Sequence, residues 1–256
     1  MGNVFAFGQQ LLDTNDLDPV YVALWEARLL QSVLRRWLLA YWCFYHAGTA
    51  SWIADQESQF WSRMETAAGS KDYPRSSERR HFRAANAIKS VAYLKSRGID
   101  GLFDPLVKFR RAADLIQHVQ RNWVGFGPWI AFKMADMVER LALAPLQFDL
   151  NSIQLFDSPR EGAELVSEQV DTYDGSPVVP WAVSTLLSHY GDYPAPPRGD
   201  RPIGLQEAET ILCKWKSHCG GHYHVGEDVS ALRRGLLWAS GCRLSQKILK
   251  VAPRAS

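Results

Sequence analysis

The stretch that most constrains the fold is WVGFGPWIAFKMADMVERLALAPLQFDLNSI, residues 123–153 of a 256-residue chain. Apolar residues recur at helical spacing before this stretch, over residues 106–121, and again within it, over residues 129–141. Only a short hairpin with two glycines, Gly125 and Gly127, separates the two segments. The sequence therefore predicts two helices joined by a tight connection.

Helical periodicity extends through most of the remaining chain, with prolines at expected helix starts and glycines at expected ends. No internal repeat and no hairpin of strands is evident. The sequence therefore predicts an all-α fold. The further expected helices span residues 20–46, 49–68, 76 or 77 to 97, 151–156, 160–170 and 181–189.

The clearest loop covers residues 191–204, GDYPAPPRGDRPIG, which is rich in proline and glycine. A chain of this length forms either one large domain or two lobes that share a cleft. We expect a helical core over residues 1–190, with the helix-hairpin-helix unit near residues 112–142. Residues 191–256 are expected to form a loop and a C-terminal helical subdomain packed on that core.

Composition narrows the class of protein. Ten tryptophans and a hydrophobic content of 46% exclude a disordered chain. The four cysteines, Cys43, Cys213, Cys219 and Cys242, follow no disulfide framework, which indicates a reducing compartment. The most apolar run, residues 37–47, is too short to cross a bilayer, and the first ten residues lack the pattern of a signal peptide. We expect a cytoplasmic protein with no membrane partner.

The glycine hairpin is suited to binding a phosphate group. Glycine permits positive φ and lets a backbone approach another molecule without a Cβ in the way. The amides of Gly125, Phe126 and Gly127, together with the N-terminus of the following helix, can face a phosphate oxygen. Such a hairpin would clamp a nucleic acid backbone without reading its sequence. An ordinary turn between two helices is the alternative interpretation.

Basic residues cluster locally, although the formal net charge is only +2. Arg79, Arg80 and Arg83 crowd the segment of residues 75–89 and can hold the phosphates of a DNA strand. Lys133, in the helix after the hairpin, is a further candidate for DNA binding. A solvated helix face is the alternative explanation of the arginine cluster.

The order of helix, Gly-x-Gly hairpin, helix and then an aspartate resembles the helix-hairpin-helix superfamily of DNA glycosylases. Asp149 follows Gly127 by 22 positions, and the resemblance places the catalytic aspartate at Asp149 and the DNA clamp at Gly125 and Gly127. It also implies two helical lobes with a cleft between them.

Two features depart from the glycosylase pattern. Bifunctional members have a Schiff-base lysine four residues after the second glycine, where this chain has Ala131, so we expect no β-lyase activity through that position. Some members hold an iron-sulfur cluster through four closely spaced C-terminal cysteines. Only Cys213 and Cys219 lie close together here, so an iron-sulfur cluster is not expected.

Four segments, residues 41–55, 127–140, 148–153 and 214–229, resemble a narrower group. This group is the amino acid:DNA transferases of bacteriophages, also called α-glutamyl/putrescinyl thymine pyrophosphorylases. The resemblance implies that the amine of a free amino acid, glycine or glutamate, displaces pyrophosphate from 5-(pyrophosphoryloxymethyl)uracil in double-stranded DNA. The reaction would take place in the cytoplasm of the phage's host.

A base in duplex DNA must be flipped out of the stack before an enzyme can reach it. Aromatic side chains can then stack on the extruded base. Tyr45, Trp52 and Trp123 are the candidates for this role, and packing in the hydrophobic core is the alternative for each.

Departing pyrophosphate needs positive charge to stabilise it. The segment CKWKSHCGGHYHVG supplies the candidates, which are Lys214, Lys216, His218, His222 and His224. Whether Mg²⁺ accompanies the pyrophosphate is left open. A zinc site formed by Cys213 and Cys219 with His222 or His224 is one alternative, and a basic surface loop without a ligand is another.

Asp149 is the candidate catalytic residue, together with Asn151. A donor amine is an ammonium ion in neutral solution, and a desolvated Asp149 can accept its proton or orient it. Asn151 is a candidate for binding the edge of the base, and capping of the next helix is the alternative role of both residues. The alternative functions are a monofunctional glycosylase that excises a modified base and a non-catalytic helix-hairpin-helix DNA-binding module.

Overall fold

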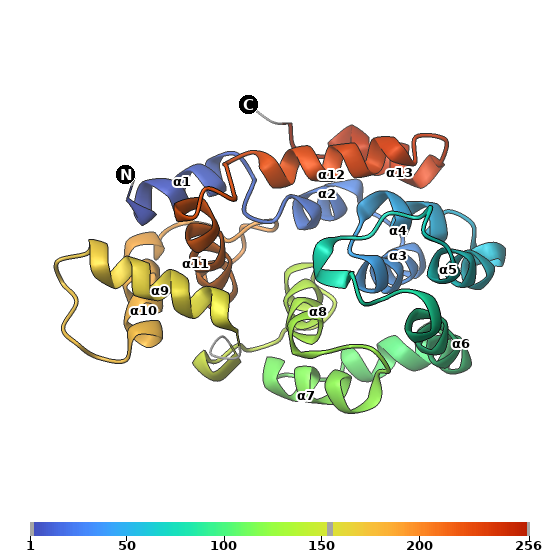
Figure 1. Ribbon diagram of the computed structural model, residues 1–256, viewed down its shortest axis with the longest axis horizontal. Coiled ribbons are helices and arrows are strands. Elements are labelled where there is room, and N and C mark those ends of the chain that lie inside the picture. The colour runs from blue at the N-terminus through green and yellow to red at the C-terminus, as the bar shows by residue number, and fades with distance from the viewer. Residues whose placement is uncertain (1–2, 153–155, 255–256) are drawn as a thin grey trace.

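The structure of the chain is a computed structural model that describes residues 3–152 and 156–254. These residues form α-helices and short 3-10 helices, with two isolated β-bridges and no strand (Figure 1). The prediction of an all-α fold is therefore confirmed. Every helix in the described residues is too short or too polar to traverse a lipid bilayer.

The helices follow one another along the chain with short connections. The α-helices are α1 (Val4–Asp13), α2 (Pro19–Ala27), α3 (Gln31–Phe44), α4 (Ala47–Ala54), α5 (Phe60–Gly69), α6 (Ala84–Leu106), α7 (Ala112–Asn122), α8 (Pro128–Arg140), α9 (Asp157–Gln169), α10 (Val178–Tyr190), α11 (Leu205–Cys219), α12 (Glu227–Trp238) and α13 (Arg243–Val251). The 3-10 helices are η1 (Glu57–Gln59), η2 (Ser77–Arg79) and η3 (Leu150–Ser152).

Buried apolar side chains form two separate clusters, which define two lobes. The larger lobe contains α2 to α8 together with α12 and α13. The smaller lobe contains α1, α9, α10 and α11. Figure 1 shows the smaller lobe on the left and the larger lobe on the right, with α8 and α11 nearest the middle.

Four expected helices differ from those observed. The helix expected over residues 106–121 begins only at Ala112. The helix expected over residues 20–46 is divided, because Arg28 adopts a left-handed conformation with φ of 45° and ends α2. The helix expected over residues 49–68 is interrupted by η1. The helix expected from Ser76 or Ser77 begins only at Ala84, and it continues past Gly98, where φ of +68° produces a kink.

Residues 191–254 contribute to both lobes and do not form a cluster of their own. The apolar side chains of α11, among them Ile211, Leu212 and Trp215, belong to the smaller lobe, whereas α12 and α13 belong to the larger one. A Cβ at Gly162 of α9 would overlap the carbonyl oxygen of Leu212, so the missing side chain lets α9 and α11 pack very closely. The boundary between the two clusters therefore runs through this segment.

Candidate functional site

A five-residue hairpin, Trp123 to Gly127, joins α7 to α8. Trp123 and Phe126 are each 4% exposed and anchor the hairpin in the larger core, whereas both glycines face solvent. The burial of Trp123 leaves no ring face for a base, so this residue takes the alternative role of a core side chain. Two buried aromatic side chains thus anchor the hairpin, while the backbone of its glycines remains accessible.

The backbone of the hairpin is held from inside. Gly125 has φ of +82°, which favours glycine, and the hydroxyl of the buried Ser90 donates to the neighbouring carbonyl oxygen of Val124 at 2.6 Å. Arg79 donates to the carbonyl oxygens of Gly125 at 3.2 Å and of Cys43 at 3.1 Å. These bonds fix the conformation in which the hairpin presents its amides.

Arg79 was expected to contact DNA, but the structure places it under the hairpin. It is only 7% exposed, and its guanidinium lies 4.9 Å from the ring centroid of Phe126 and 4.7 Å from that of Phe82. Burial lowers its pKa to about 10. Arg79 therefore supports the hairpin. Arg80 and Arg83, which follow it closely in the sequence, are exposed at the surface.

Gly127 occupies the N-cap position of α8 in extended backbone conformation. A Cβ built at Gly127 would meet no atom within 4 Å, so packing within the protein does not require glycine here. The first amides of α8 point out of the helix without intrahelical acceptors. The open space at Gly127 lets a phosphate group come close to the backbone, where these amides can bind it.

Lys133, the other expected DNA contact, is buried in the structure. Its ammonium group lies 3.2 Å from Oε2 of Glu209 on α11, and the two side chains are 9% and 4% exposed. Desolvation alone would lower the pKa of Lys133, but the combined negative charge of Glu209, Asp136 and Asp18 holds it above its ordinary value. Lys133 therefore joins the two lobes and does not present its charge to a ligand.

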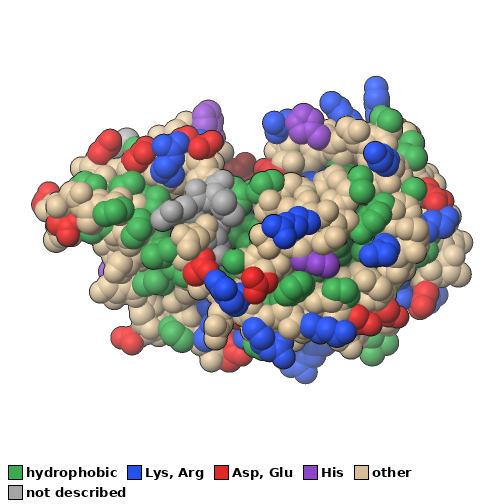
Figure 2. All heavy atoms as spheres, turned by 90° about the horizontal axis from the view of Figure 1, so that it is seen from below, with side chains coloured by type: hydrophobic (Ala, Val, Ile, Leu, Met, Phe, Trp, Pro, Cys, Tyr) green, Lys and Arg blue, Asp and Glu red, His purple; other side chains and the backbone are tan. Residues whose placement is uncertain are grey.

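Basic side chains are spread over one face of the larger lobe. Figure 2 views the molecule from below and shows Lys and Arg side chains over its right half, with acidic side chains at the left end and also among them. Exposed basic residues of the neighbouring α6–α7 connection and of α7 include Lys108, Arg110, Arg111 and Arg121. No sequence pattern singles these residues out, because they form no compact run.

Asp149 lies beside the start of α7. Its Oδ2 is 3.6 Å from Nη2 of Arg111, and the aspartate side chain is 39% exposed. Because α7 has 11 residues, its start lies about 16 Å along the helix axis from the hairpin, at 1.5 Å per residue. Asp149 is therefore accessible to a ligand, but it is not adjacent to the two glycines.

Asn151 is exposed and belongs to η3. The helix expected over residues 151–156 falls partly outside the described residues, because residues 153–155 are not among them. The catalytic roles of Asp149 and Asn151 remain predictions.

A cavity of about 380 Å³ lies next to the hairpin, and we call it the tyrosine pocket. Tyr21, Tyr41 and Tyr45 contribute to its wall, and Trp129, in the first turn of α8, closes one side. The rings of Tyr45 and Trp129 meet edge to face at 4.8 Å between centroids. The pocket therefore begins two residues after Gly127 and includes one of the three expected stacking residues.

Helices α4 and α12 complete the tyrosine pocket. A Cβ at Gly48 would overlap the carbonyl oxygen of Gly235, so these two glycines bring the helices very close. Asp228 and Leu232 of α12 thereby face the pocket next to Ala47 of α4. No sequence pattern indicates the pocket, because its wall combines residues from five separate segments of the chain.

The backbone at the junction of α3 and α4 is unusual. Tyr45 has φ of 49°, a left-handed conformation that is uncommon for a side chain of this size and is often found at functional sites. His46 then caps α4 by accepting a hydrogen bond from the amide of Thr49 at its Nδ1. Burial lowers the pKa of His46 to about 4, so the ring is neutral near pH 7.

Trp52, the remaining stacking candidate, lines a different cavity. Its ring lies 4.6 Å from that of Tyr73, and the guanidinium of Arg63 stacks 4.9 Å above it. Trp238 closes this second cavity, which has a volume of about 560 Å³. The structure thus separates Trp52 from the tyrosine pocket.

The cations expected to bind pyrophosphate point in different directions. Lys214 forms an ion pair with Asp228 at 2.6 Å, and Lys216 forms one with Glu161 at 3.2 Å. His218 stacks on Phe7 with 4.7 Å between ring centroids, whereas His222 and His224 are exposed. The structure does not gather these five side chains into one site.

Comparison with known proteins decides the class of this chain. A family model described as amino acid:DNA transferase matches residues 10–224. The chain belongs to the amino acid:DNA transferase family. The family description names an amino acid and DNA, so the chain is a transferase with DNA and an amino acid as substrates.

Two relatives of the transferase come from bacteriophages. The chain is 37% identical to the glycinyltransferase of Pseudomonas phage PaMx11, and the match covers 98% of this chain and 96% of the relative. It is 24% identical to the putrescinyltransferase of Delftia phage PhiW-14, over 90% of this chain and 77% of the relative. The identified class agrees with the resemblance seen in the sequence.

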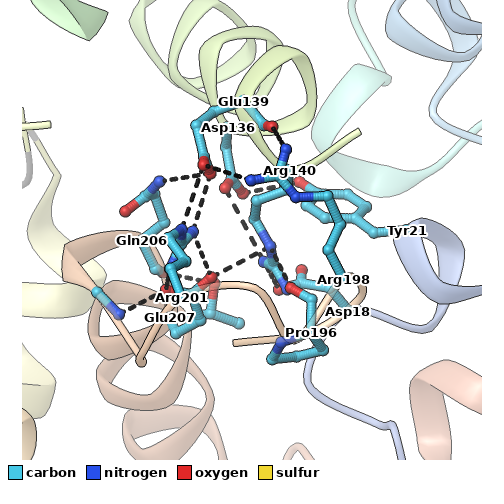
Figure 3. A network of polar contacts seen from close by, with 12 residues as sticks. Asp18, Tyr21, Asp136, Glu139, Arg140, Pro196, Arg198, Arg201, Gln206 and Glu207 are labelled. Atoms are coloured by element: carbon cyan, nitrogen blue, oxygen red, sulfur yellow. Dashed lines mark hydrogen bonds and ion pairs between the residues drawn. The ribbon is translucent and has the colours of Figure 1, made fainter. Parts of the chain in front are cut away.

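A buried ionic network joins the two lobes of the transferase, as Figure 3 shows. Arg140 of α8 pairs with Asp18 before α2 and, at 3.2 Å, with Glu207 of α11. Arg201 lies 2.8 Å from Glu139 of α8 and 3.0 Å from Glu207. Each pairing links residues far apart in the sequence, so α8 is held in one orientation between the lobes.

Asp136 lies at the centre of this network. It is fully buried and accepts a hydrogen bond from the hydroxyl of Tyr21 at 2.8 Å. Burial raises its pKa to about 7, although Arg140 and Lys133 act in the opposite direction. Tyr21 also lines the tyrosine pocket, so the ionic network supports the wall of that pocket.

No three His, Cys, Asp or Glu side chains within the described residues converge as a metal site requires. Cys213 and Cys219 are both free thiols there. The zinc alternative for this segment therefore has no preformed ligand set in the described part of the chain.

Proposed function

We propose that this transferase attaches glycine to 5-(pyrophosphoryloxymethyl)uracil in double-stranded DNA and releases pyrophosphate. The observation that supports glycine as donor is the 37% identity, over nearly the whole of both chains, to a protein named glycinyltransferase. The putrescinyltransferase is a more distant relative at 24% identity. Glutamate, the other donor considered from the sequence, has no such relative among these two.

The proposed reaction is a substitution at the exocyclic methylene carbon of the base. The amine nitrogen of glycine forms a bond to this carbon, while the bond from carbon to oxygen breaks and its electron pair leaves with pyrophosphate. Before attack, the ammonium form must lose one proton to a base. Asp149 is the proposed acceptor, and its side chain is 39% exposed beside Arg111.

The hairpin provides the proposed DNA contact. Gly127 leaves open space where a phosphate can meet the first amides of α8, and the buried Arg79 and Ser90 hold the hairpin rigid. A phosphate bound there places the strand next to the tyrosine pocket, into which a nucleotide flipped out of the duplex can extend. The hairpin contact is independent of DNA sequence.

Nucleoside mass spectrometry tests this function. The protein is incubated with duplex DNA that contains 5-(pyrophosphoryloxymethyl)uracil and with an equimolar mixture of amino acids, and the DNA is then digested to nucleosides. We expect a glycine adduct, one pyrophosphate released per adduct and an intact strand. A glutamate adduct would reassign the donor, and alkali-labile abasic sites would indicate a glycosylase. Repeating the reaction with a chelator tests whether Mg²⁺ accompanies the pyrophosphate.

A further inference from the structure

We propose that the tyrosine pocket is the binding site for the amino group of the donor, which it receives as an ammonium ion. This inference rests on the proposed transfer of an amino acid to DNA and adds the location and the chemistry of the donor site. The pocket binds a primary ammonium group among carboxylates and aromatic rings, and it makes no ion pair with the carboxylate of the donor.

The charges around the pocket favour a cation. Asp18, Glu78 and Asp228 line it, and no Lys or Arg is among the described residues of its wall. Arg140 and Lys214 each pair with one of these carboxylates from outside the pocket, at Asp18 and Asp228. The carboxylates outnumber these two cations, so an entering anion such as pyrophosphate would still meet net negative charge.

A fourth acidic residue strengthens this field. Asp16 is fully buried behind the wall, where its carboxylate accepts bonds from the amides of Gly226, at 2.7 Å, and Val229, at 2.8 Å. Loss of hydration raises the pKa of Asp228, and the charges of Asp16 and Asp18 raise it further, while Lys214 opposes them. These like charges repel one another, and a bound ammonium ion would relieve that repulsion.

The aromatic wall also suits an ammonium ion. The faces of tyrosine and tryptophan rings attract cations, and several such rings together form the usual cage for amines. Tyr41 and Tyr45 lie tilted against each other at 4.6 Å between centroids, and Trp129 meets Tyr45 at 4.8 Å. The rings therefore form a continuous surface on one side of the pocket.

A polar group without a partner points to a missing ligand. The hydroxyl oxygen of Ser76 belongs to the pocket lining and is buried, yet it has no hydrogen-bond partner among the described residues. Buried hydroxyls are normally hydrogen-bonded, so this oxygen calls for a donor from a ligand. An ammonium group has three donors and no acceptor, which matches a wall of carboxylates and a hydroxyl.

The position of the pocket agrees with this role. Trp129, at its edge, lies two residues after Gly127, so a base flipped out of a strand held at the hairpin would reach the pocket mouth. An ammonium ion bound inside would then face the exocyclic carbon of the base. Asp149 lies at the other end of α7 from the hairpin, so the proton lost before attack would reach it through intervening water. Near-attack geometry of this kind is what a transfer between two bound substrates requires.

Saturation-transfer NMR on the whole protein tests binding without turnover. The probes are glycine, ethylammonium, which has the amino group alone, and acetate, which has the carboxylate alone. Each is measured with free protein and with protein bound to duplex DNA that lacks the activated base. We expect transfer to glycine and ethylammonium but none to acetate, and we expect Asp228→Asn to abolish both signals. Asp171→Asn, an exposed acidic residue after α9, is the matched control and should keep them.

Steady-state kinetics supply the second readout. Losing one charge-assisted hydrogen bond costs about 1.5–3 kcal/mol, so Asp228→Asn should raise KM for glycine by about 10- to 100-fold. KM for DNA should change by no more than about two-fold, which corresponds to about 0.4 kcal/mol. Ser76→Ala should raise KM for glycine in the same direction. Transfer to acetate, or unchanged glycine binding in Asp228→Asn, would overturn the assignment.

The two proposals fail in different ways. If the wild-type protein adds no amino acid to activated DNA yet binds ethylammonium through Asp228, the proposed reaction fails and the ammonium site stands. If it transfers glycine while Asp228→Asn binds and uses glycine normally, the reaction stands and the site is elsewhere.

Discussion

Nη1 of Arg79 lies 3.2 Å from the carbonyl oxygen of Gly125, beneath a hairpin whose opposite side is open to solvent. The residue expected to touch DNA thus fixes the shape of the loop that presents the amides. Replacing it should change stability first and DNA binding as a consequence.

Arg79→Met should lower the free energy of unfolding by about 3 kcal/mol, because hydrogen bonds to charged groups contribute about 1.5–3 kcal/mol each and two carbonyl oxygens lose their donor. Urea unfolding monitored by circular dichroism measures this change. Arg80→Met removes an exposed guanidinium from the neighbouring position and should shift stability by less than about 0.5 kcal/mol. Equal effects of the two substitutions would contradict the supporting role of Arg79.

Gly127→Ser should separate DNA binding from folding. Serine is a favourable N-cap residue and a Cβ meets no atom at this position, so stability should remain within about 0.5 kcal/mol of the wild-type value. The added side chain occupies the space proposed for a phosphate, so affinity for duplex DNA should fall at least about ten-fold, or about 1.4 kcal/mol. Fluorescence anisotropy with labelled duplex measures the affinity. Gly69→Ser, at the open end of α5, is the control and should bind DNA normally.

Lys133→Met should destabilise the protein by about 3–5 kcal/mol, since it leaves Glu209 buried without its partner. The double variant Lys133→Met with Glu209→Gln removes both charges and should recover a large part of that loss. Thermal or urea unfolding of the wild type, both single variants and the double variant gives the coupling free energy. If the single and double variants are equally stable, the ion pair does not join the lobes as described.

His46 should make stability depend on pH. Burial lowers its folded pKa to about 4, whereas the unfolded side chain titrates near 6.5, so the neutral ring favours the folded state. This contribution is complete above pH 6.5 and is lost as the pH falls toward 4. His46→Asn keeps an acceptor for the amide of Thr49 and removes the titration. The decline in urea midpoint between pH 7 and pH 5 should therefore be smaller in the variant, and an identical decline would contradict the assignment.

The local parts of the fold were predictable from the sequence. The hairpin between α7 and α8 follows from helical periodicity on both sides of two glycines, and positive φ at Gly125 agrees with that choice of residue. The division between α2 and α3 was not predictable, because Arg28 adopts a left-handed conformation that its residue type does not signal. Tertiary packing overrides local preference at such positions.

The candidate site was less predictable, since its contacts join distant residues. Lys133 is buried because Glu209 lies 76 positions later, and no local pattern indicates that partner. The tyrosine pocket combines Asp18 with Asp228 through the close packing of α4 and α12. Asp149 was found by its spacing from Gly127, but its neighbour Arg111 was not, because the contact depends on how residues 141–149 turn back toward the start of α7.

Asp149→Asn should distinguish a catalytic role from a structural one. Asparagine keeps the size of the side chain and removes the negative charge and the ability to accept a proton. The aspartate is partly exposed beside an exposed arginine, so the substitution should change the free energy of unfolding by less than about 1 kcal/mol.

Loss of a general base typically reduces the rate by about 10²- to 10⁴-fold. The kcat for glycine transfer should therefore fall by that range in Asp149→Asn, while affinity for duplex DNA and KM for glycine remain near their wild-type values. Single-turnover kinetics with activated duplex and saturating glycine measure this rate, with Asp149→Glu as the variant that retains a carboxylate. A rise in KM for glycine with unchanged kcat would place Asp149 in donor binding, and an unchanged rate would remove it from the reaction.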